Sequence, residues 1–80
     1  AHHVLVIDDS EIIRSVMCSA LQDAGYAVHA AEDGRAALDL LDGRPIDTIV
    51  CDVSMPRLDG IGFLRSLRAN ARYGRVPVLC

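Results

Sequence analysis

The stretch that decides the fold is residues 49–60, which reads IVCDVSMPRLDG. Its first three residues are typical of a buried strand, and Asp52 follows them directly. Pro56 has no amide hydrogen for a strand ladder, so the strand must end before it. Asp59 and Gly60 then precede a segment with helical periodicity. Asp52 is therefore predicted at the carboxyl end of a strand, where open α/β sheets bind their ligands.

Strand and helix patterns alternate on both sides of this stretch. Strands are predicted at residues 4–7, 26–30, 46–51 and 76–80. Helical spacing of apolar residues predicts helices at 11–24, after Asp33, and from Asp59, and Asp33 can cap the second of these helices. Such alternation indicates parallel strands joined by right-handed crossovers. The predicted fold class is α/β, a flavodoxin-like doubly wound parallel sheet with strand order 2-1-3-4.

The composition indicates one small domain. The chain has 80 residues, is 51% apolar and carries a net charge of -3. All eight basic residues are arginine and form no basic stripe, which argues against nucleic acid as a partner. No apolar run approaches the roughly 18 residues of a membrane span, and no leader pattern is visible. A cytoplasmic protein without a membrane partner is expected.

The cysteines and histidines give no sign of a metal site. Cys18, Cys51 and Cys80 are widely spaced and form no CxxC motif, so buried free thiols are expected. His2 and His3 stand at the start of the sequence, where they could be remnants of a tag, and His29 lies in an apolar run. Metal binding by these histidines is not expected.

Three carboxylates follow two strands that should be neighbours. Asp8 and Asp9 end the strand at 4–7, and Asp52 ends the third strand. Since neighbouring strands lie about 4.8 Å apart, the three side chains should converge. Each like-charge pair at about 5 Å would cost roughly 3 kcal/mol. Protonation or a divalent cation such as Mg²⁺ would relieve this repulsion, and an aspartate beside Mg²⁺ suits phosphoryl transfer.

Ordinary structural roles compete with this interpretation. Asp9 or Ser10 could cap the first helix, and Asp59 is expected to cap the third. Asp52 has no helix directly after it, so capping explains it poorly, but it could still be a chance acid at a strand end. Ser54 could be a plain loop hydroxyl that adjusts water access.

Four motifs, in order, resemble the receiver domain of two-component response regulators, most closely the stand-alone chemotaxis type. They are VLVIDDS at 4–10, AEDG at 31–34 with Ala37 and Leu38, DVSMPRLDG at 52–60, and VPVL at 76–79. Residues 1–80 would form the amino-terminal two-thirds of one such domain, ending after its fourth strand.

The resemblance implies a role for each matching residue. Asp52 corresponds to the phosphoacceptor. Asp8, Asp9, Asp52 and the backbone carbonyl of Ser54 correspond to the protein ligands of Mg²⁺. The phosphoryl donor would be a phosphohistidine on a sensor histidine kinase or a histidine phosphotransfer domain, and the signal would pass to an output protein or domain. The domain would not be an enzyme beyond its own phosphotransfer and dephosphorylation.

The family also has features that residues 1–80 do not include. Its Ser or Thr after the fourth strand would fall just beyond Cys80, and its Lys and aromatic switch residue belong to a fifth strand. The sequence has no lysine at all. An 80-residue chain is therefore expected to bind Mg²⁺ but to accept or respond to phosphoryl groups poorly. The open edge of the fourth strand predicts dimerisation.

Three other functions compete with the receiver interpretation. One is an interaction or dimerisation module that carries no phosphate. Another is a phosphatase with an aspartate nucleophile, which would need a second acid where Ser54 stands. A flavin-binding flavodoxin is disfavoured because the acidic loop after the first strand would repel a phosphate.

Overall fold

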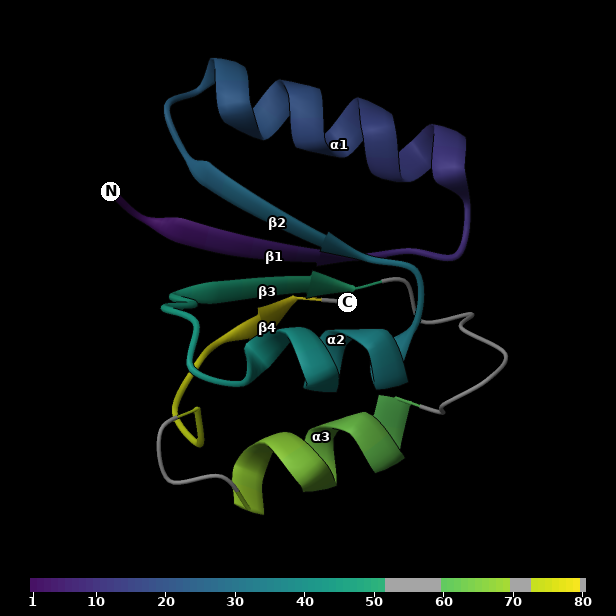
Figure 1. Ribbon diagram of the computed structural model, residues 1–80, viewed down its shortest axis with the longest axis vertical. Coiled ribbons are helices and arrows are strands. Elements are labelled where there is room, and N and C mark those ends of the chain that lie inside the picture. Colours follow the sequence, from purple (N-terminus) through teal and green to yellow (C-terminus); the bar gives the residue numbers. More distant parts are fainter. Residues whose placement is uncertain (52–59, 70–72, 80) are drawn as a thin grey trace.

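The computed structural model describes residues 1–51, 60–69 and 73–79, with the side chains of 60–64 left aside. Strands and helices alternate along the described chain, as predicted (Figure 1). They are β1 (His3–Ile7), α1 (Glu11–Asp23), β2 (Ala27–Ala31), α2 (Gly34–Leu41), β3 (Thr48–Cys51), α3 (Gly60–Ala69) and β4 (Val78–Leu79). None of these helices has the length and apolar character needed to cross a bilayer.

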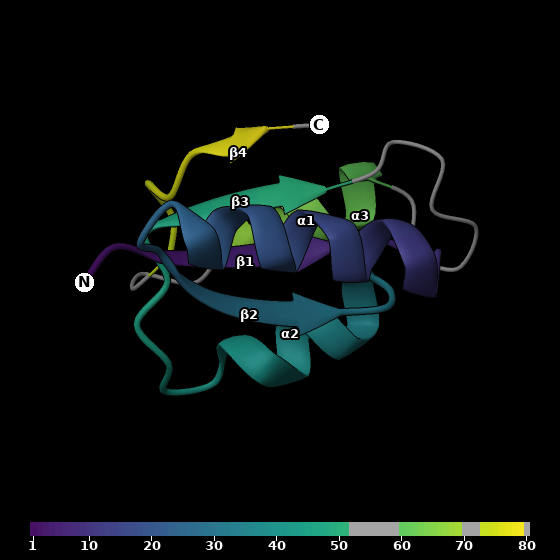
Figure 2. The same cartoon turned by 90° about the horizontal axis from the view of Figure 1, so that it is seen from above.

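The strands form one parallel sheet in the order β2-β1-β3-β4, which confirms the predicted fold class. In this register Ile7, the last residue of β1, lies opposite Ala31 of β2 and Cys51 of β3. The carboxyl ends of these three strands therefore meet at one edge of the sheet. Figure 2 shows the strands side by side, with β2 and β4 on the outside.

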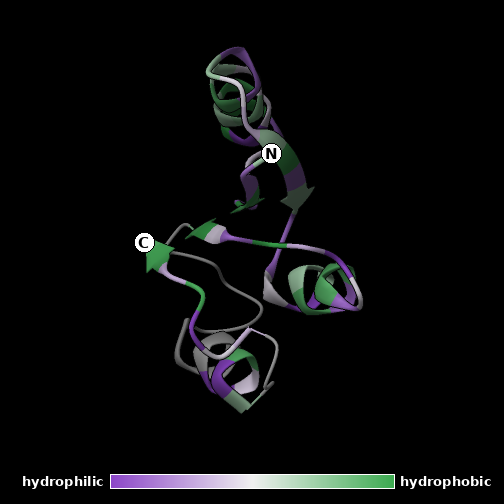
Figure 3. Cartoon of the chain, turned by 90° about the vertical axis from the view of Figure 1, so that its left-hand side faces the viewer, coloured by the Kyte–Doolittle hydropathy of each residue, from purple (hydrophilic) through white to green (hydrophobic). Residues whose placement is uncertain are grey.

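Helices cover the two faces of the sheet unequally. α2 and α3 lie on one side, and α1 lies alone on the other (Figures 1 and 3). The hydrophobic core fills the side of α2 and α3, and the strands contribute Leu5, Ile7 and Ile49 to it. Leu41 of α2 and Leu67 of α3 close this core. Burial of side chains of this size stabilises the fold by about 1.5–3 kcal/mol each.

The apolar face of α1 is more exposed than its sequence pattern predicts. None of its residues is buried, and Ile12, Ile13 and Val16 are 78%, 50% and 63% exposed. α1 packs against β1 and β2. Beside it a hollow of about 180 Å³ opens over β3 and β4, lined in part by Val50 and Leu79. The periodicity of the sequence correctly indicates an apolar stripe on α1, but only part of that stripe packs against the sheet.

Local polar groups decide where several elements start and stop. The carboxylate of Asp33 accepts the amide of Ala36 at 2.8 Å and caps α2, as predicted. Gly25 has φ +97°, the left-handed conformation that ends α1. β4 starts two residues later than predicted because the amide of Val76 donates to Tyr73 and Pro77 has none to offer.

The prediction of free thiols is only partly correct. Cys18 is free, as expected, but it is only half-buried. Cys51 is buried, as expected, but it is disulfide-bonded, so the expectation of a free thiol is wrong there. Cysteine spacing could not indicate this, because pairing depends on which strands the fold brings together. Cys80 lies outside the described residues.

Candidate functional site

Asp8 and Asp9 lie where β1 ends, at the edge at which the sequence predicts chemistry. Asp8 is only 5% exposed, whereas Asp9 is exposed to solvent. The amide of Asp8 donates to the carbonyl of Ala31, which extends the pairing with β2 by one residue. Oδ1 of Asp8 accepts the amide of Ser10 at 2.9 Å. These two bonds fix the Asp8 backbone and side chain at the sheet edge.

Arg14 also holds this end of β1 in place. Its Nη1 donates to the backbone carbonyl of Asp8 at 2.8 Å, which ties the strand end to the first turn of α1. Sequence reasoning missed Arg14 as part of the site. A hydrogen bond from a side chain to a backbone carbonyl leaves no sequence motif, and Arg14 lies six positions from its acceptor.

The competition between Asp9 and Ser10 for the helix cap has a clear outcome. Ser10 is the N-cap: it has extended backbone angles, and its Oγ accepts the amide of Ile13 at 3.3 Å. Ser10 therefore provides the stabilisation that the start of α1 requires. The carboxylate of Asp9 has no capping role, so capping cannot account for an acid at this position.

The remaining predicted site residues, Asp52 and Ser54, lie outside the described residues, as does Asp59. The described part of β3 still bears on the prediction, because Cys51 pairs with Ile7. In the sequence, Asp52 directly follows Cys51 and Asp8 directly follows Ile7, so the two aspartates come after paired strand ends. Within residues 1–51, 60–69 and 73–79, no three His, Cys, Asp or Glu side chains come together to hold a metal.

The acidic edge fits Mg²⁺ by the chemistry of its donors. Mg²⁺ prefers a few carboxylate oxygens and keeps several waters. Asp9 offers a solvent-facing carboxylate, and Asp8 beside it is held by backbone hydrogen bonds. The hydrogen bond from the Ser10 amide orients the Asp8 carboxylate. Both residues therefore suit a site for a hard cation.

The fold agrees with comparisons against known proteins. A family model described as the response regulator receiver domain matches residues 4–80. The chain belongs to this family. The receiver domain is a module of two-component signalling, and its family is a signalling family rather than a class of enzymes.

Individual response regulators are similar to this receiver domain over most of the length of this chain. The response regulator MprA of Mycolicibacterium vanbaalenii is 46% identical over 67 residues, which are 84% of this chain and 29% of that protein. The two-component response regulator ORR5 of Oryza sativa subsp. japonica is 34% identical and covers 99% of this chain. The chain spans 60% of ORR5.

A solved structure gives the same result. The chemotaxis response regulator CheY4 of Vibrio cholerae superposes with a TM-score of 0.90 at 40% identity, over 96% of this chain and 64% of that one. The receiver domain described here thus spans less than two thirds of MprA, ORR5 and CheY4.

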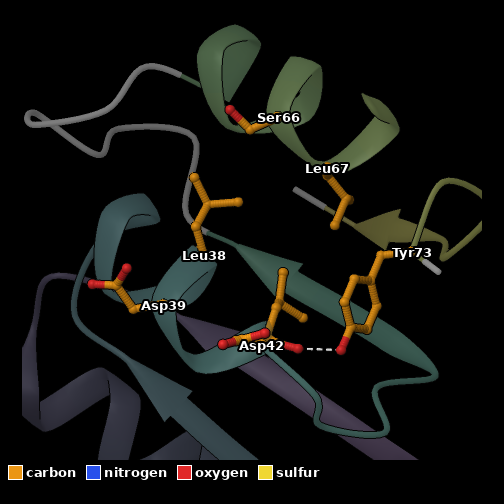
Figure 4. Close-up of a pocket in the computed structure, with 7 residues that line it drawn as sticks. Leu38, Asp39, Asp42, Ser66, Leu67 and Tyr73 are labelled. Carbon is orange, nitrogen blue, oxygen red and sulfur yellow. Dashed lines mark hydrogen bonds between the residues drawn. The ribbon is translucent and has the colours of Figure 1, made fainter. Parts of the chain in front are cut away.

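A second polar region of the receiver domain lies between α2 and α3 (Figure 4). A cavity of about 370 Å³ is lined by leucines, by the carboxylates of Asp39 and Asp42, and by Ser66 and Tyr73. The Tyr73 hydroxyl donates to the carbonyl of Leu41 and contacts that of Arg44 at 2.6 Å. Tyr73 lies in the turn before β4, yet it is only 3% exposed. It joins the end of α2 to the turn before β4.

Proposed function

We propose that this receiver domain accepts a phosphoryl group on Asp52 from a phosphohistidine donor and, in response, regulates an output partner. The observation that carries the proposal is the pairing of Ile7 with Cys51, with Asp8 and Asp9 directly after Ile7. It supports an acidic site built from the ends of β1 and β3. Family membership supports the same function.

The chemistry needs an oxygen nucleophile and a means of containing negative charge. A carboxylate oxygen of Asp52 would form the new P–O bond while the P–N bond to the donor imidazole breaks, and the imidazole nitrogen keeps the electron pair. Asp9, Asp8, Asp52 and the carbonyl of Ser54 would hold Mg²⁺. When bound, Mg²⁺ neutralises charge on the phosphoryl oxygens. The side chain of Ser54 would adjust water access to the acyl phosphate.

Partners and location follow from the same proposal. The donor would be a sensor histidine kinase or a histidine phosphotransfer domain, and the receiver would act in the cytoplasm. Beyond its own phosphotransfer and dephosphorylation it would catalyse no reaction. Similarity to MprA and CheY4 supports a place in two-component signalling.

Phosphorylation with a small donor tests the assignment. The chain should take up radiolabelled phosphate from acetyl phosphate, at the low rate expected for residues 1–80, when Mg²⁺ is present, and Asp52→Asn should abolish labelling. Asp23→Asn is a matched control, because Asp23 is an exposed aspartate at the far end of α1. Labelling that persists in Asp52→Asn, or that is equally strong in EDTA, would refute the proposal.

A second candidate function is that of a dimerisation module. β4 is the outer strand of the described sheet, and Leu79 on it is 60% exposed. Unpaired strand edges favour pairing with another chain. Leu79→Arg should shift a concentration-dependent dimer toward monomer in light scattering. A wild-type chain that stays monomeric up to millimolar concentration would exclude this function.

A further inference from the structure

The histidines gather at the amino end of the sheet, opposite the acidic edge. His2 directly precedes β1, His3 is the first residue of β1, and His29 lies on β2. Nε2 of His2 lies 2.8 Å from Oγ1 of Thr48. Nδ1 of His3 lies 3.1 Å from Nε2 of His29. These contacts join the start of β1 to both neighbouring strands, and the receiver function proposed above does not use them.

The contact between His3 and His29 constrains how many protons the pair can hold. The ring planes are inclined by 30° and the ring centroids lie 5.4 Å apart, so the two nitrogens make the contact. A hydrogen bond there needs one nitrogen to donate and the other to accept. If both imidazoles were protonated, two N–H groups and two positive charges would face each other. The contact therefore survives with one proton between the facing nitrogens and not with two.

We propose that His3 and His29 form a pH-dependent clasp between β1 and β2. The clasp is closed while one proton lies between the facing nitrogens, and it opens when both imidazoles are protonated. Opening releases the start of β1 from β2.

The groups around His29 favour opening in acid. His29 is half-buried, and the positive charges near it are those of His3 and of Arg44 from the loop before β3. Burial lowers the pKa of His29 below its ordinary value of 6.5, and these two cations lower it further. The carboxylate of Asp47 accepts the backbone amide of His3 at 2.7 Å, so this acid neighbours His3.

The sign of the effect follows from the lowered pKa. The folded state binds a proton at His29 less readily than the unfolded state does. The clasp therefore contributes its full stability above pH 6.5, and this contribution falls as the pH drops through the folded pKa. Because the two rings are in contact, the titration of His29 should depend on His3.

NMR titration of the imidazole resonances in the full chain tests the coupling. His29 should titrate below pH 6.5 in the wild type. His3→Gln removes a titrating neighbour and should move the His29 midpoint upward in a single step. His2→Gln is the matched control, because His2 contacts Thr48 rather than His29, and it should leave the His29 midpoint unchanged. A His29 midpoint that is the same in His3→Gln and wild type would overturn the proposal.

Hydrogen exchange measures the opening itself and needs no variant. The Ala27 amide donates to the carbonyl of His2 at 3.0 Å, next to the clasp. Its protection factor should fall roughly tenfold between pH 7.5 and pH 5.5 as the pair takes up its second proton. Carboxylates with ordinary pKa values near 4 stay ionised in this range. Protection that does not change with pH in the wild type would overturn the clasp, even if His3→Gln failed to fold.

Discussion

The amide of Ser10 donates to Oδ1 of Asp8 across 2.9 Å, while the hydroxyl of Ser10 accepts the amide of Ile13. One serine thus both orients the buried acid after β1 and starts α1. Asp9, between Asp8 and Ser10, is left facing solvent. Because Ser10 and not an aspartate caps α1, the acidic side chains and the helix cap can be altered by separate substitutions.

Asp9→Asn should weaken Mg²⁺ binding without unfolding the domain. The variant removes an exposed charge that has no capping role. Affinity should fall roughly tenfold or more, because losing even a supporting residue around a metal costs about 10- to 100-fold. Calorimetric titration with MgCl₂ measures the change, and thermal unfolding in EDTA checks that the fold is intact. Asp23→Asn should bind Mg²⁺ like the wild type, and equal affinity in Asp9→Asn would remove Asp9 from the site.

Ser10→Ala should destabilise the domain by about 1 kcal/mol, the usual cost of losing a helix N-cap. The hydroxyl bond to Ile13 is lost, but the Ser10 amide can still donate to Asp8. Urea unfolding followed by circular dichroism gives the free energy of unfolding. Ser15→Ala, an exposed substitution within α1, is the control and should not destabilise. Equal stability of Ser10→Ala and Ser15→Ala would mean that Ser10 does not cap the helix.

Tyr73→Phe should destabilise the domain by about 1–3 kcal/mol. The variant keeps the buried ring but removes the hydroxyl that contacts the carbonyls of Leu41 and Arg44. Leaving buried acceptors without a donor carries that cost. Tyr26→Phe, at a ring that is 40% exposed, should change the free energy of unfolding much less. If the two variants unfold at the same urea concentration, the Tyr73 hydroxyl does not join α2 to the turn before β4.

Asp47→Asn should flatten the acid end of the stability curve. The backbone amide of His3 donates to Asp47 and holds the pKa of this carboxyl below its ordinary value of 3.8. The contribution of Asp47 to the free energy of unfolding is therefore present above pH 3.8, and it is lost as the pH falls through the lower pKa of the folded state. Thermal unfolding from pH 6 to pH 2 measures the slope. If the melting temperature of Asp47→Asn falls with pH below pH 4 as steeply as that of the wild type, the Asp47 carboxylate does not contribute to stability.

Local patterns were sufficient to predict the order of elements and the capping of α2. Asp33 could be identified as the cap of α2 because it directly precedes the helix and the amide that its carboxylate accepts is only three residues away. The choice between Asp9 and Ser10 could not be made in the same way, since both types of side chain can cap. It depends on the path of the backbone between β1 and α1.

Contacts between residues far apart in the sequence could not be predicted from local patterns. Tyr73 donates to a carbonyl 32 positions away, and His3 contacts a ring 26 positions away. Nothing in the local sequence of a loop tyrosine or a leading histidine indicates such partners. The exposure of Ile12 and Val16 also depends on distant parts of the chain. Periodicity shows that a helix has an apolar face, but this face is buried only where the sheet extends beneath it.

The position of β1 between two parallel neighbours also limits how this domain can change in length. One residue inserted within β1 would shift its hydrogen bonds to both β2 and β3 and turn Leu5 and Ile7 to the opposite face. It would move Asp8 and Asp9 along with them. An insertion at Gly43, in the turn after α2, would touch neither ladder. Length variation is therefore compatible with the fold in the turn at Gly43 and incompatible with it in β1, the strand that leads to the acid pair.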